Sequence, residues 1–117
     1  MAGFRELKVY ERSYELVIEV YRITKGFPRE ELFAMTNQMR RAAMSIPMNI
    51  AEGYAKRESQ ADFKRFLMMA RGSAAEMSVL LDLGRDLEYI DAGKHKEISD
   101  QYEEVAKMLN VFTSRLK

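Results

Sequence analysis

One segment constrains this chain more than any other: Thr36 to Tyr54, TNQMRRAAMSIPMNIAEGY. Its apolar and small residues recur at steps of three and four positions, which places them along one side of a helix. These residues, with the one just before the segment, are Met35, Met39, Ala42, Ile46, Ile50 and Gly53. Pro47 cannot donate to the Ala43 carbonyl, so we expect a local kink near Ile46. The segment therefore predicts a long helix with one buried side.

A second helical pattern precedes this segment, between residues 7 and 24. It contains two adjacent apolar rows, which are Leu7, Tyr10, Tyr14, Val17, Tyr21 and Thr24, and Val9, Ser13, Leu16, Val20 and Ile23. Gly26 stands where a helix would end, and Pro28 favours the start of a new helical turn. That turn is expected to lead into the next helix, with Thr36 as an internal cap. Two rows on one helix indicate more than one packing partner.

Two more helices are predicted after the central segment. Ser59 and Asp62 resemble a capping box at the start of a third helix, which is expected to end at Tyr89 and Ile90. Two apolar rows run along this helix: the first is Phe63, Leu67, Ala70, Ala74, Met77, Leu81 and Gly84, and the second is Phe66, Met69, Ser73, Leu80, Leu83 and Leu87. Asp91 is expected to cap a last helix, whose single apolar row ends at Leu116. Because the connections are short and no strand pattern occurs, the fold class is all-α, an up-and-down antiparallel four-helix bundle.

Composition narrows the class of protein further. The 117 residues suit one domain, so we expect residues 1–117 to form a single bundle with one core. The chain contains no cysteine, which excludes disulfides and thiolate metal sites and agrees with a reducing cytoplasm. Charges interrupt every apolar run, so neither a signal peptide nor a membrane span is expected. These features favour a cytoplasmic protein without membrane contact.

The formal net charge of +1 conceals an uneven distribution. Residues 40–72 carry seven bases and three acids, whereas residues 73–117 carry six bases and nine acids. A basic region of this kind can be the footprint of a nucleic-acid site. It equally suits the basic surface of one subunit that meets the acidic surface of a neighbour, and we prefer this second interpretation.

The bases of the middle region gather around the expected turn between the second and third helices. They are Lys56, Arg57, Lys64, Arg65 and Arg71, with Tyr54 beside them. Cations at one end of a bundle can contact phosphates in a salt-sensitive, largely sequence-independent way, and a tyrosine can add base stacking. The alternative is a solvated helix end without a ligand, and both interpretations stay open here.

Polar residues on otherwise apolar faces suggest a structural lock. Arg40 and Arg41 point about 100° apart on a helix, so one of them is expected to face inward, toward an acid. The expected lock consists of Arg40, Arg41, Asn49, Glu52 and Glu76. Paired carboxylates without a nearby histidine are weak evidence of acid–base chemistry. We therefore expect no catalytic residues and no enzyme activity.

Other chemistry finds little support in the sequence. His95 is the only histidine and is flanked by lysines, so we expect it to be solvated. It lacks the second histidine or the spaced glutamate of helical metal sites, and no Gly-rich phosphate loop occurs. We therefore expect neither a metal nor a cofactor.

The apolar rows predict an oligomer. With two rows on the first and third helices, a monomer would expose an apolar patch that soluble monomers rarely tolerate. Gly72 to Ala75 form a patch of small residues through which another backbone could approach, and a packing reason for Gly72 is expected. The residues expected at or beside the subunit interface are Phe66, Met69, Ser73 and Leu80, with Arg40 or Arg41 at its polar edge.

The string from Arg40 to Gly53, RRAAMSIPMNIAEG, resembles the signature of a four-helix bundle family, the 23S ribosomal RNA intervening-sequence proteins. The likeness extends to Leu7, Val9, Tyr10, Thr24 to Phe33, Phe63, Phe66, Leu67, Gly72 to Glu76, and Lys107 to Asn110. Met48 replaces a small residue of the family pattern, and Ala55-Lys56 replaces Gly-Arg. The resemblance implies four-helix subunits in a pentameric barrel. It also implies a distant relationship to the accessory variability determinant of diversity-generating retroelements, which binds a reverse transcriptase and nucleic acid.

Two hypotheses about function follow. The first is a non-enzymatic, ring-forming protein that binds RNA or DNA, or that scaffolds a reverse transcriptase or another nucleic-acid enzyme, through its basic surface. The second is a protein–protein interaction module, in which charge serves assembly alone. Under both hypotheses the chain forms a homo-oligomer, and the resemblance favours a pentamer.

Overall fold

A computed structural model describes residues 3–116 of the chain. Four long helices account for most of these residues, and no β-strand occurs among them. The helices are α1 (Lys8–Thr24), α2 (Asn37–Ala55), α3 (Gln60–Asp86) and α4 (Ala92–Ser114). Each lies where the sequence predicted a helix, and α2 continues through Pro47.

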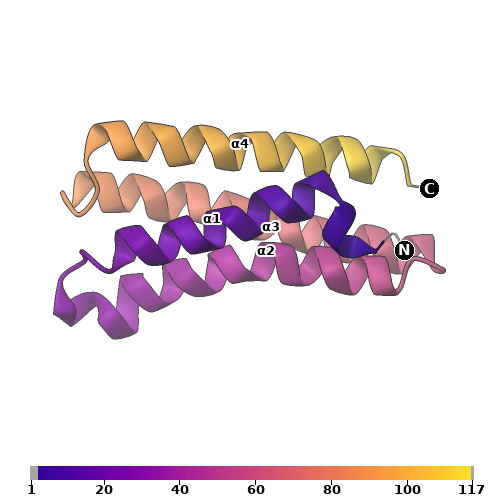
Figure 1. The fold of residues 1–117 in the computed structure, drawn as a ribbon, viewed down its shortest axis with the longest axis horizontal. Helices are drawn as coiled ribbons and strands as arrows, with labels where there is room; N and C mark the ends of the chain where they lie inside the picture. Colours follow the sequence, from indigo (N-terminus) through magenta and orange to yellow (C-terminus); the bar gives the residue numbers. More distant parts are fainter. Residues whose placement is uncertain (1–2, 117) are drawn as a thin grey trace.

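Consecutive helices run in opposite directions and pack side by side, and α1 also contacts α4 (Figure 1). The bundle measures 44 × 24 × 23 Å. The turn between α2 and α3 lies at the same end as the start of α1 and the end of α4. The α1–α2 and α3–α4 connections lie at the opposite end. The fold is the up-and-down four-helix bundle that the sequence predicted.

All four helices contribute buried side chains to one core. The largest of these with almost no exposed surface are Met39, Ile46, Ile50, Leu67, Met77, Leu81, Ile98, Tyr102 and Leu109. Complete burial of one large aliphatic side chain contributes roughly 1.5–3 kcal/mol, so this core is the main source of stability. The apolar rows predicted for α2 and α4, and the first row predicted for α3, enter this core.

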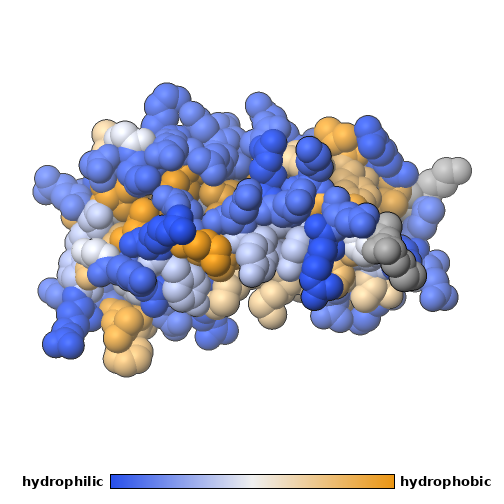
Figure 2. Space-filling model, viewed as in Figure 1, coloured by the Kyte–Doolittle hydropathy of each residue, from blue (hydrophilic) through white to orange (hydrophobic). Residues whose placement is uncertain are grey.

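The two rows predicted for α1 differ in burial. Val9, Ser13, Leu16 and Val20 lie in the core, whereas the tyrosine row stays nearer the surface. The side chain of Tyr14 is 52% exposed. Figure 2 shows that hydrophobic residues reach the surface between hydrophilic ones on the face in view. The outer side of α1 therefore remains partly apolar.

Two predicted helix caps are confirmed. Ser59 Oγ accepts a hydrogen bond from the amide of Asp62 at 3.1 Å, which caps α3. Asp91 Oδ1 accepts one from the amide of Lys94 at 2.7 Å, which caps α4. Each cap satisfies a backbone donor that has no partner within its helix, and contributes roughly 1 kcal/mol.

The predicted cap at Thr36 is wrong. A 3₁₀ turn, η2 (Arg29–Glu31), and a π turn, η3 (Leu32–Thr36), lead directly into α2, and Thr36 makes no side-chain capping bond. Glu31 accepts the bond from the amide of Met35 at 3.4 Å instead. Helical turns begin at Arg29, before the apolar pattern that predicted α2, so the capping residue lies earlier in the chain than Thr36.

The sequence also placed the end of α3 too late. The helix stops at Asp86, and Glu88 adopts a left-handed backbone conformation with a φ of 65°. The amides of Tyr89 and Ile90 then bond back to the Gly84 carbonyl at 2.8 and 3.1 Å. Gly84 permits this reversal, because a β-carbon there would lie 2.7 Å from Ile90 Cδ1. The apolar residues after Asp86 therefore fold back onto the helix and do not extend it.

Candidate nucleic-acid interface

The predicted basic cluster surrounds the turn between α2 and α3. Lys56 directly follows the last residue of α2, and Arg57 lies in the turn. Lys64 and Arg65 follow in the first turns of α3; Lys64 is partly buried and Arg65 is exposed. Arg71 is exposed about two helical turns beyond Lys64. The structure therefore brings four of the five cations to the turn and places Arg71 farther along α3.

Two aromatic rings lie beneath the cations of the turn. The Arg57 guanidinium carbon lies 4.1 Å from the centroid of the Tyr54 ring, and Arg57 Nη1 donates to the Tyr54 carbonyl at 3.0 Å. Lys56 and Arg65 lie over the Phe66 ring at 5.0 and 4.5 Å. Such contacts are worth about 0.5–1 kcal/mol at exposed sites. Because Arg57 occupies one face of Tyr54, that face is not open for the expected base stacking.

Two of these cations also have acidic partners. Lys56 Nζ lies 3.5 Å from Glu52 Oε2, and Arg65 Nη2 lies 3.7 Å from Asp62 Oδ1. All four side chains are about half exposed, so each pair contributes only about 0–1 kcal/mol. The pairs nevertheless reduce the positive potential at the turn.

The other three cations are not paired in this way. Among residues 3–116, no carboxylate oxygen lies within 4 Å of a side-chain nitrogen of Arg57, Lys64 or Arg71. Their charge is balanced only by solvent and counterions. These three residues are therefore the strongest candidates for phosphate contacts.

Arg71 borders a groove of about 600 Å³ between α3 and α4. Gly72 and Ala75 line the groove, and a β-carbon added to Gly72 would meet no atom within 4 Å apart from its own helix backbone. The expected packing reason for this glycine is thus not found inside the subunit. Tyr102 also borders the groove, and its buried hydroxyl has no hydrogen-bond partner in the described part of the chain. Burial raises the pKa of this phenol above its ordinary value.

The inward-facing arginine of α2 is Arg40. Its Nε donates to Thr24 Oγ1 at 2.8 Å, and its guanidinium carbon lies 4.4 Å from the centroid of the Tyr21 ring. Arg41 is exposed. Arg40 therefore contacts a hydroxyl and an aromatic ring, where the sequence analysis expected an acid.

The remaining members of the expected polar lock bind partners nearer to them. Asn49 donates to the Ser45 carbonyl at 2.8 Å, Glu52 pairs with Lys56 at 3.5 Å, and Glu76 accepts from Gln38 at 2.8 Å. Glu52 and Glu76 are both exposed, so burial does not force either acid to pair with an arginine. The expected lock is therefore not formed within one subunit.

The four residues expected at a subunit interface differ in their exposure. Phe66 and Leu80 are buried in the subunit. Ser73 is half-buried and donates to Ser45 Oγ at 2.8 Å. Met69 is 48% exposed. Of these four, Met69 has the most surface to offer a neighbouring subunit.

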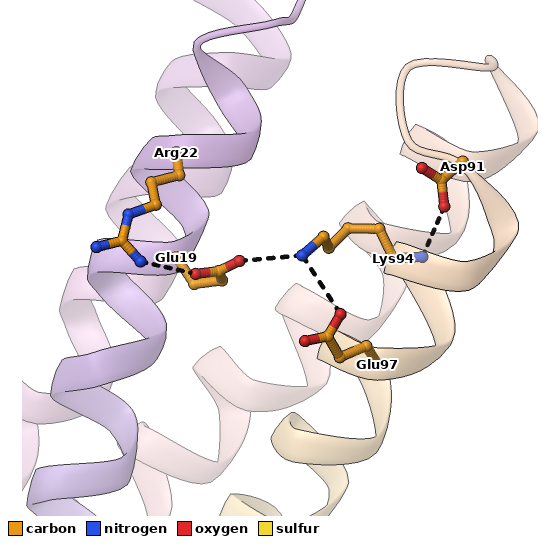
Figure 3. A network of polar contacts seen from close by, with 5 residues as sticks. All are labelled: Glu19, Arg22, Asp91, Lys94 and Glu97. Atoms are coloured by element: carbon orange, nitrogen blue, oxygen red, sulfur yellow. Dashed lines mark hydrogen bonds and ion pairs between the residues drawn. The ribbon is translucent and has the colours of Figure 1, made fainter.

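The sequence did not reveal a polar network that joins α1 to α4 (Figure 3). Lys94 Nζ lies 3.3 Å from Glu19 Oε1 and 3.3 Å from Glu97 Oε2. Arg22 donates to the other oxygen of Glu19 at 3.2 Å. The hydrogen bonds to Glu19 and then to Glu97 raise the pKa of Lys94. No local pattern could pair Glu19 with Lys94, because 75 positions separate them.

The expectation that His95 is solvated is wrong. The side chain is only 12% exposed, and its Nε2 lies 2.8 Å from Asp82 Oδ1 and 3.3 Å from Ser99 Oγ. The serine and the aspartate meet the same ring nitrogen. The imidazole therefore cannot take a proton from the serine at one nitrogen while the aspartate holds the other, as a catalytic triad requires.

Among residues 3–116, no group of three or more histidine, cysteine, aspartate or glutamate side chains is placed to hold a metal ion. No helix in this part of the chain combines the length and the apolar content that a bilayer crossing needs. The features of the candidate site are therefore its cations and the aromatic rings beneath them.

The fold and the site define an all-helical bundle with a cationic turn at one end. The chain belongs to the family of 23S rRNA-intervening sequence proteins, which it matches over residues 5–111. It is also similar to the crystal structure of a protein with unknown function from the S23 ribosomal protein family of Bacteroides thetaiotaomicron. That likeness has 29% sequence identity and a TM-score of 0.82, and covers 91% of this chain and 95% of the other. No curated protein matches this chain. The family resemblance found in the sequence is confirmed.

Proposed function

We propose that this protein is a non-enzymatic helical bundle that binds RNA or DNA through the turn between α2 and α3. The observation that carries the proposal is that Arg57, Lys64 and Arg71 of the basic region have no carboxylate oxygen within 4 Å of their side-chain nitrogens among the described residues. Such cations release counterions when they neutralise phosphates, which drives binding. The family description, which refers to an intervening sequence of 23S ribosomal RNA, supports RNA as a ligand.

The contacts at the turn favour binding without sequence preference. Lysine and arginine contacts to phosphates position a nucleic acid but carry no base information. The Arg57 guanidinium already lies over the Tyr54 ring and donates to the Tyr54 carbonyl, so the side chain loses less freedom when it meets a phosphate. The cationic side chains of the turn would therefore bind the phosphates of the strand whatever its base sequence.

We also propose that the subunits assemble into a homo-oligomeric ring, with a pentamer favoured by the family resemblance. Two separate apolar surfaces support this proposal. Tyr14 and Met48, 52% and 67% exposed, border a groove of about 370 Å³ between α1 and α2. Met69 and Val79, 48% and 59% exposed, lie on α3. Two different patches suit head-to-tail contacts, which close into a ring when the rotation allows.

Each further copy in such a ring would repeat the basic turn, so that one nucleic acid could meet several turns. A reverse transcriptase or another nucleic-acid enzyme could then be held on the same assembly. The alternative is a protein–protein interaction module in which the cations serve assembly alone. The ion pairs of Lys56 and Arg65 with neighbouring acids favour this alternative.

Nucleic-acid binding can be tested by fluorescence anisotropy with a labelled RNA stem-loop and a labelled single-stranded DNA. The test variant carries Arg57→Glu, Lys64→Glu and Arg71→Glu. A matched control carries Arg22→Glu, Arg85→Glu and Lys96→Glu, which are exposed, lie toward the opposite end of the bundle and change the net charge equally. We expect the test variant to bind roughly tenfold more weakly or worse, and its affinity to depend less on salt.

The two hypotheses give different results in this experiment. Under nucleic-acid binding, the control variant retains most of the affinity, because its substitutions lie away from the turn. Equal binding by the test variant and the unmodified protein would reject the turn as the interface. If the unmodified protein does not bind either nucleic acid at low salt, nucleic-acid binding is rejected and the protein–protein interaction module is favoured.

Assembly can be tested by light scattering at micromolar concentration. We expect a mass several times the 13.6 kDa of one chain, with five copies favoured. Met48→Glu should reduce the mass, because a charge in an apolar interface is costly. Gln101→Glu, at an exposed position of α4, serves as the control. A mass of one subunit would refute the oligomer, and a stable dimer would refute the ring.

A further inference from the structure

A small pocket lies at the opposite end of the bundle from the basic turn, where α1 is connected to α2. Its volume is about 280 Å³, near the lower end of the range of roughly 300–1,000 Å³ for ligand pockets. Its polar wall consists of Thr24, Lys25, Arg29, Thr36 and Arg40, and none of the described residues that line it is acidic. The pocket thus brings three cationic residues and two hydroxyl-bearing residues together from α1, η2 and the start of α2.

Arg40 is held with most of its hydrogen-bonding capacity unused. Its Nε is occupied by Thr24, whose hydroxyl in turn donates to the Val20 carbonyl at 2.7 Å. The Tyr21 ring supports the plane of the guanidinium. An arginine has five N–H donors, so four remain on the two terminal nitrogens. The side chain is therefore fixed in place and still able to bind an acceptor.

No acid neutralises this group of cations. Among residues 3–116, no carboxylate oxygen lies within 4 Å of a side-chain nitrogen of Lys25, Arg29 or Arg40. The acid next to the pocket wall, Glu31, accepts hydrogen bonds from the Tyr89 hydroxyl at 2.9 Å and the Met35 amide at 3.4 Å. Each of its oxygens accepts a hydrogen bond from another group, and neither lies within 4 Å of a pocket cation.

Thr36 adds a further donor to the same wall. The residue is buried, yet its side chain makes no capping bond to α2. It borders the pocket together with Arg40, one helical turn farther along. A hydroxyl in this position can donate to an anion, whereas an apolar ligand would leave it unsatisfied.

We propose that this pocket binds a phosphate group, either free or carried by a nucleotide, with Arg40 as its anchor. Arginine presents a planar set of donors that matches two oxygens of a phosphate at once. Three neighbouring cations repel one another in the empty pocket, and a dianion relieves this repulsion better than a singly charged carboxylate. The site is separate from the α2–α3 turn, so the proposal does not depend on nucleic-acid binding there.

The test is a titration with inorganic phosphate at pH 7.5 and constant ionic strength, followed by calorimetry and by the NMR signal of the Arg40 Nε–H group. We expect saturable binding of one phosphate per subunit. Arg40→Gln should weaken binding roughly ten- to hundredfold, as expected for the loss of hydrogen bonds to a charged group. Arg41→Gln is the matched control, because it removes the same charge from the adjacent, exposed position. We expect it to leave binding nearly unchanged.

Two other variants separate binding from folding. Thr36→Val keeps the shape of the side chain and removes its hydroxyl, and Arg40→Lys keeps the charge and removes the planar set of donors. We expect both to bind more weakly than the unmodified protein, with helical circular dichroism unchanged. If Arg40→Gln fails to fold, these two variants and Arg29→Gln carry the test.

A second titration with adenosine monophosphate identifies the source of the phosphate. Equal affinities would show that the anion alone is the ligand, and tighter binding of the nucleotide would show that the phosphate is carried by a larger molecule. Either result supports the site. The proposal is overturned by the absence of saturable phosphate binding, by equal affinity for acetate, or by equal losses in Arg40→Gln and Arg41→Gln.

Discussion

A β-carbon placed on Gly53 of α2 would lie 2.9 Å from the β-carbon of Phe66 on α3. It would also lie 3.3 Å from the Phe63 carbonyl oxygen, which belongs to the backbone of α3. The two helices are therefore close enough at this point that only glycine fits without a shift. This contact places the Phe66 ring beneath Lys56 and Arg65, so it also positions the candidate interface.

Gly53→Ala should destabilise the protein. The added methyl group must push α2 away from α3, and overpacking of this kind typically costs about 1–3 kcal/mol. The free energy of unfolding, measured by urea titration, should fall by that amount. An unchanged value would mean that the two backbones separate easily here.

Gly72→Ala is the matched substitution in an open position, and it should have the opposite effect. Alanine is favoured over glycine inside a helix by about 1 kcal/mol, and the new methyl group meets no atom within 4 Å apart from its own helix backbone. We expect a higher free energy of unfolding under conditions in which the protein is monomeric. A lower free energy of unfolding for Gly72→Ala under these conditions would contradict the open space beside Gly72.

Glu88→Gly should stabilise the connection between α3 and α4. Glu88 has a φ of 65°, a conformation that costs a residue with a β-carbon about 1–2 kcal/mol relative to its right-handed form. Glycine adopts it without that cost, so the melting temperature should rise. Glu88→Ala is the control, since it removes the carboxylate and keeps the β-carbon. Equal melting temperatures for the two variants would contradict the role of backbone strain.

Tyr102→Phe should leave stability at neutral pH unchanged or increase it by about 1 kcal/mol. The hydroxyl is buried and has no partner in the described part of the chain, so its removal relieves an unsatisfied group. Urea titration at pH 8 measures this effect. A loss of several kcal/mol would indicate a hydrogen bond to this hydroxyl in solution.

The same pair of proteins should differ in alkaline solution. Burial raises the pKa of Tyr102 in the folded protein above the ordinary value of 10.0. Below pH 10 the phenol is protonated in both states, and above it only the unfolded state loses the proton. The stability of the unmodified protein should thus fall as pH rises above 10, by up to about 1.4 kcal/mol per pH unit from this group. Tyr102→Phe should lack this contribution, and parallel curves between pH 8 and 11 would contradict the assignment.

Local patterns in the sequence determined the four helices and most of their ends. Steps of three and four positions identified the buried rows of α2 and α4, because helical geometry alone brings such residues to one side. Ser59 and Asp91 were recognised as caps because a cap acts on amides only two or three positions away. The cationic residues near the α2–α3 turn were likewise visible, since they are close in sequence. These features depend only on residues that are close together in the sequence, so the sequence is enough to predict them.

The tertiary structure alone decided which side chains meet across the bundle. Helical periodicity predicted two apolar rows on α1, and only the packing of α1 against α2 and α4 placed Val20 inside and left Tyr14 at the surface. The contacts of Arg40 with Thr24, and of His95 with Asp82, depend on how far one helix is shifted along another. Helical periodicity shows which side of a helix a residue lies on, but not which residue of the neighbouring helix it meets. The packing of the whole core decides this, because it sets the position of one helix along another.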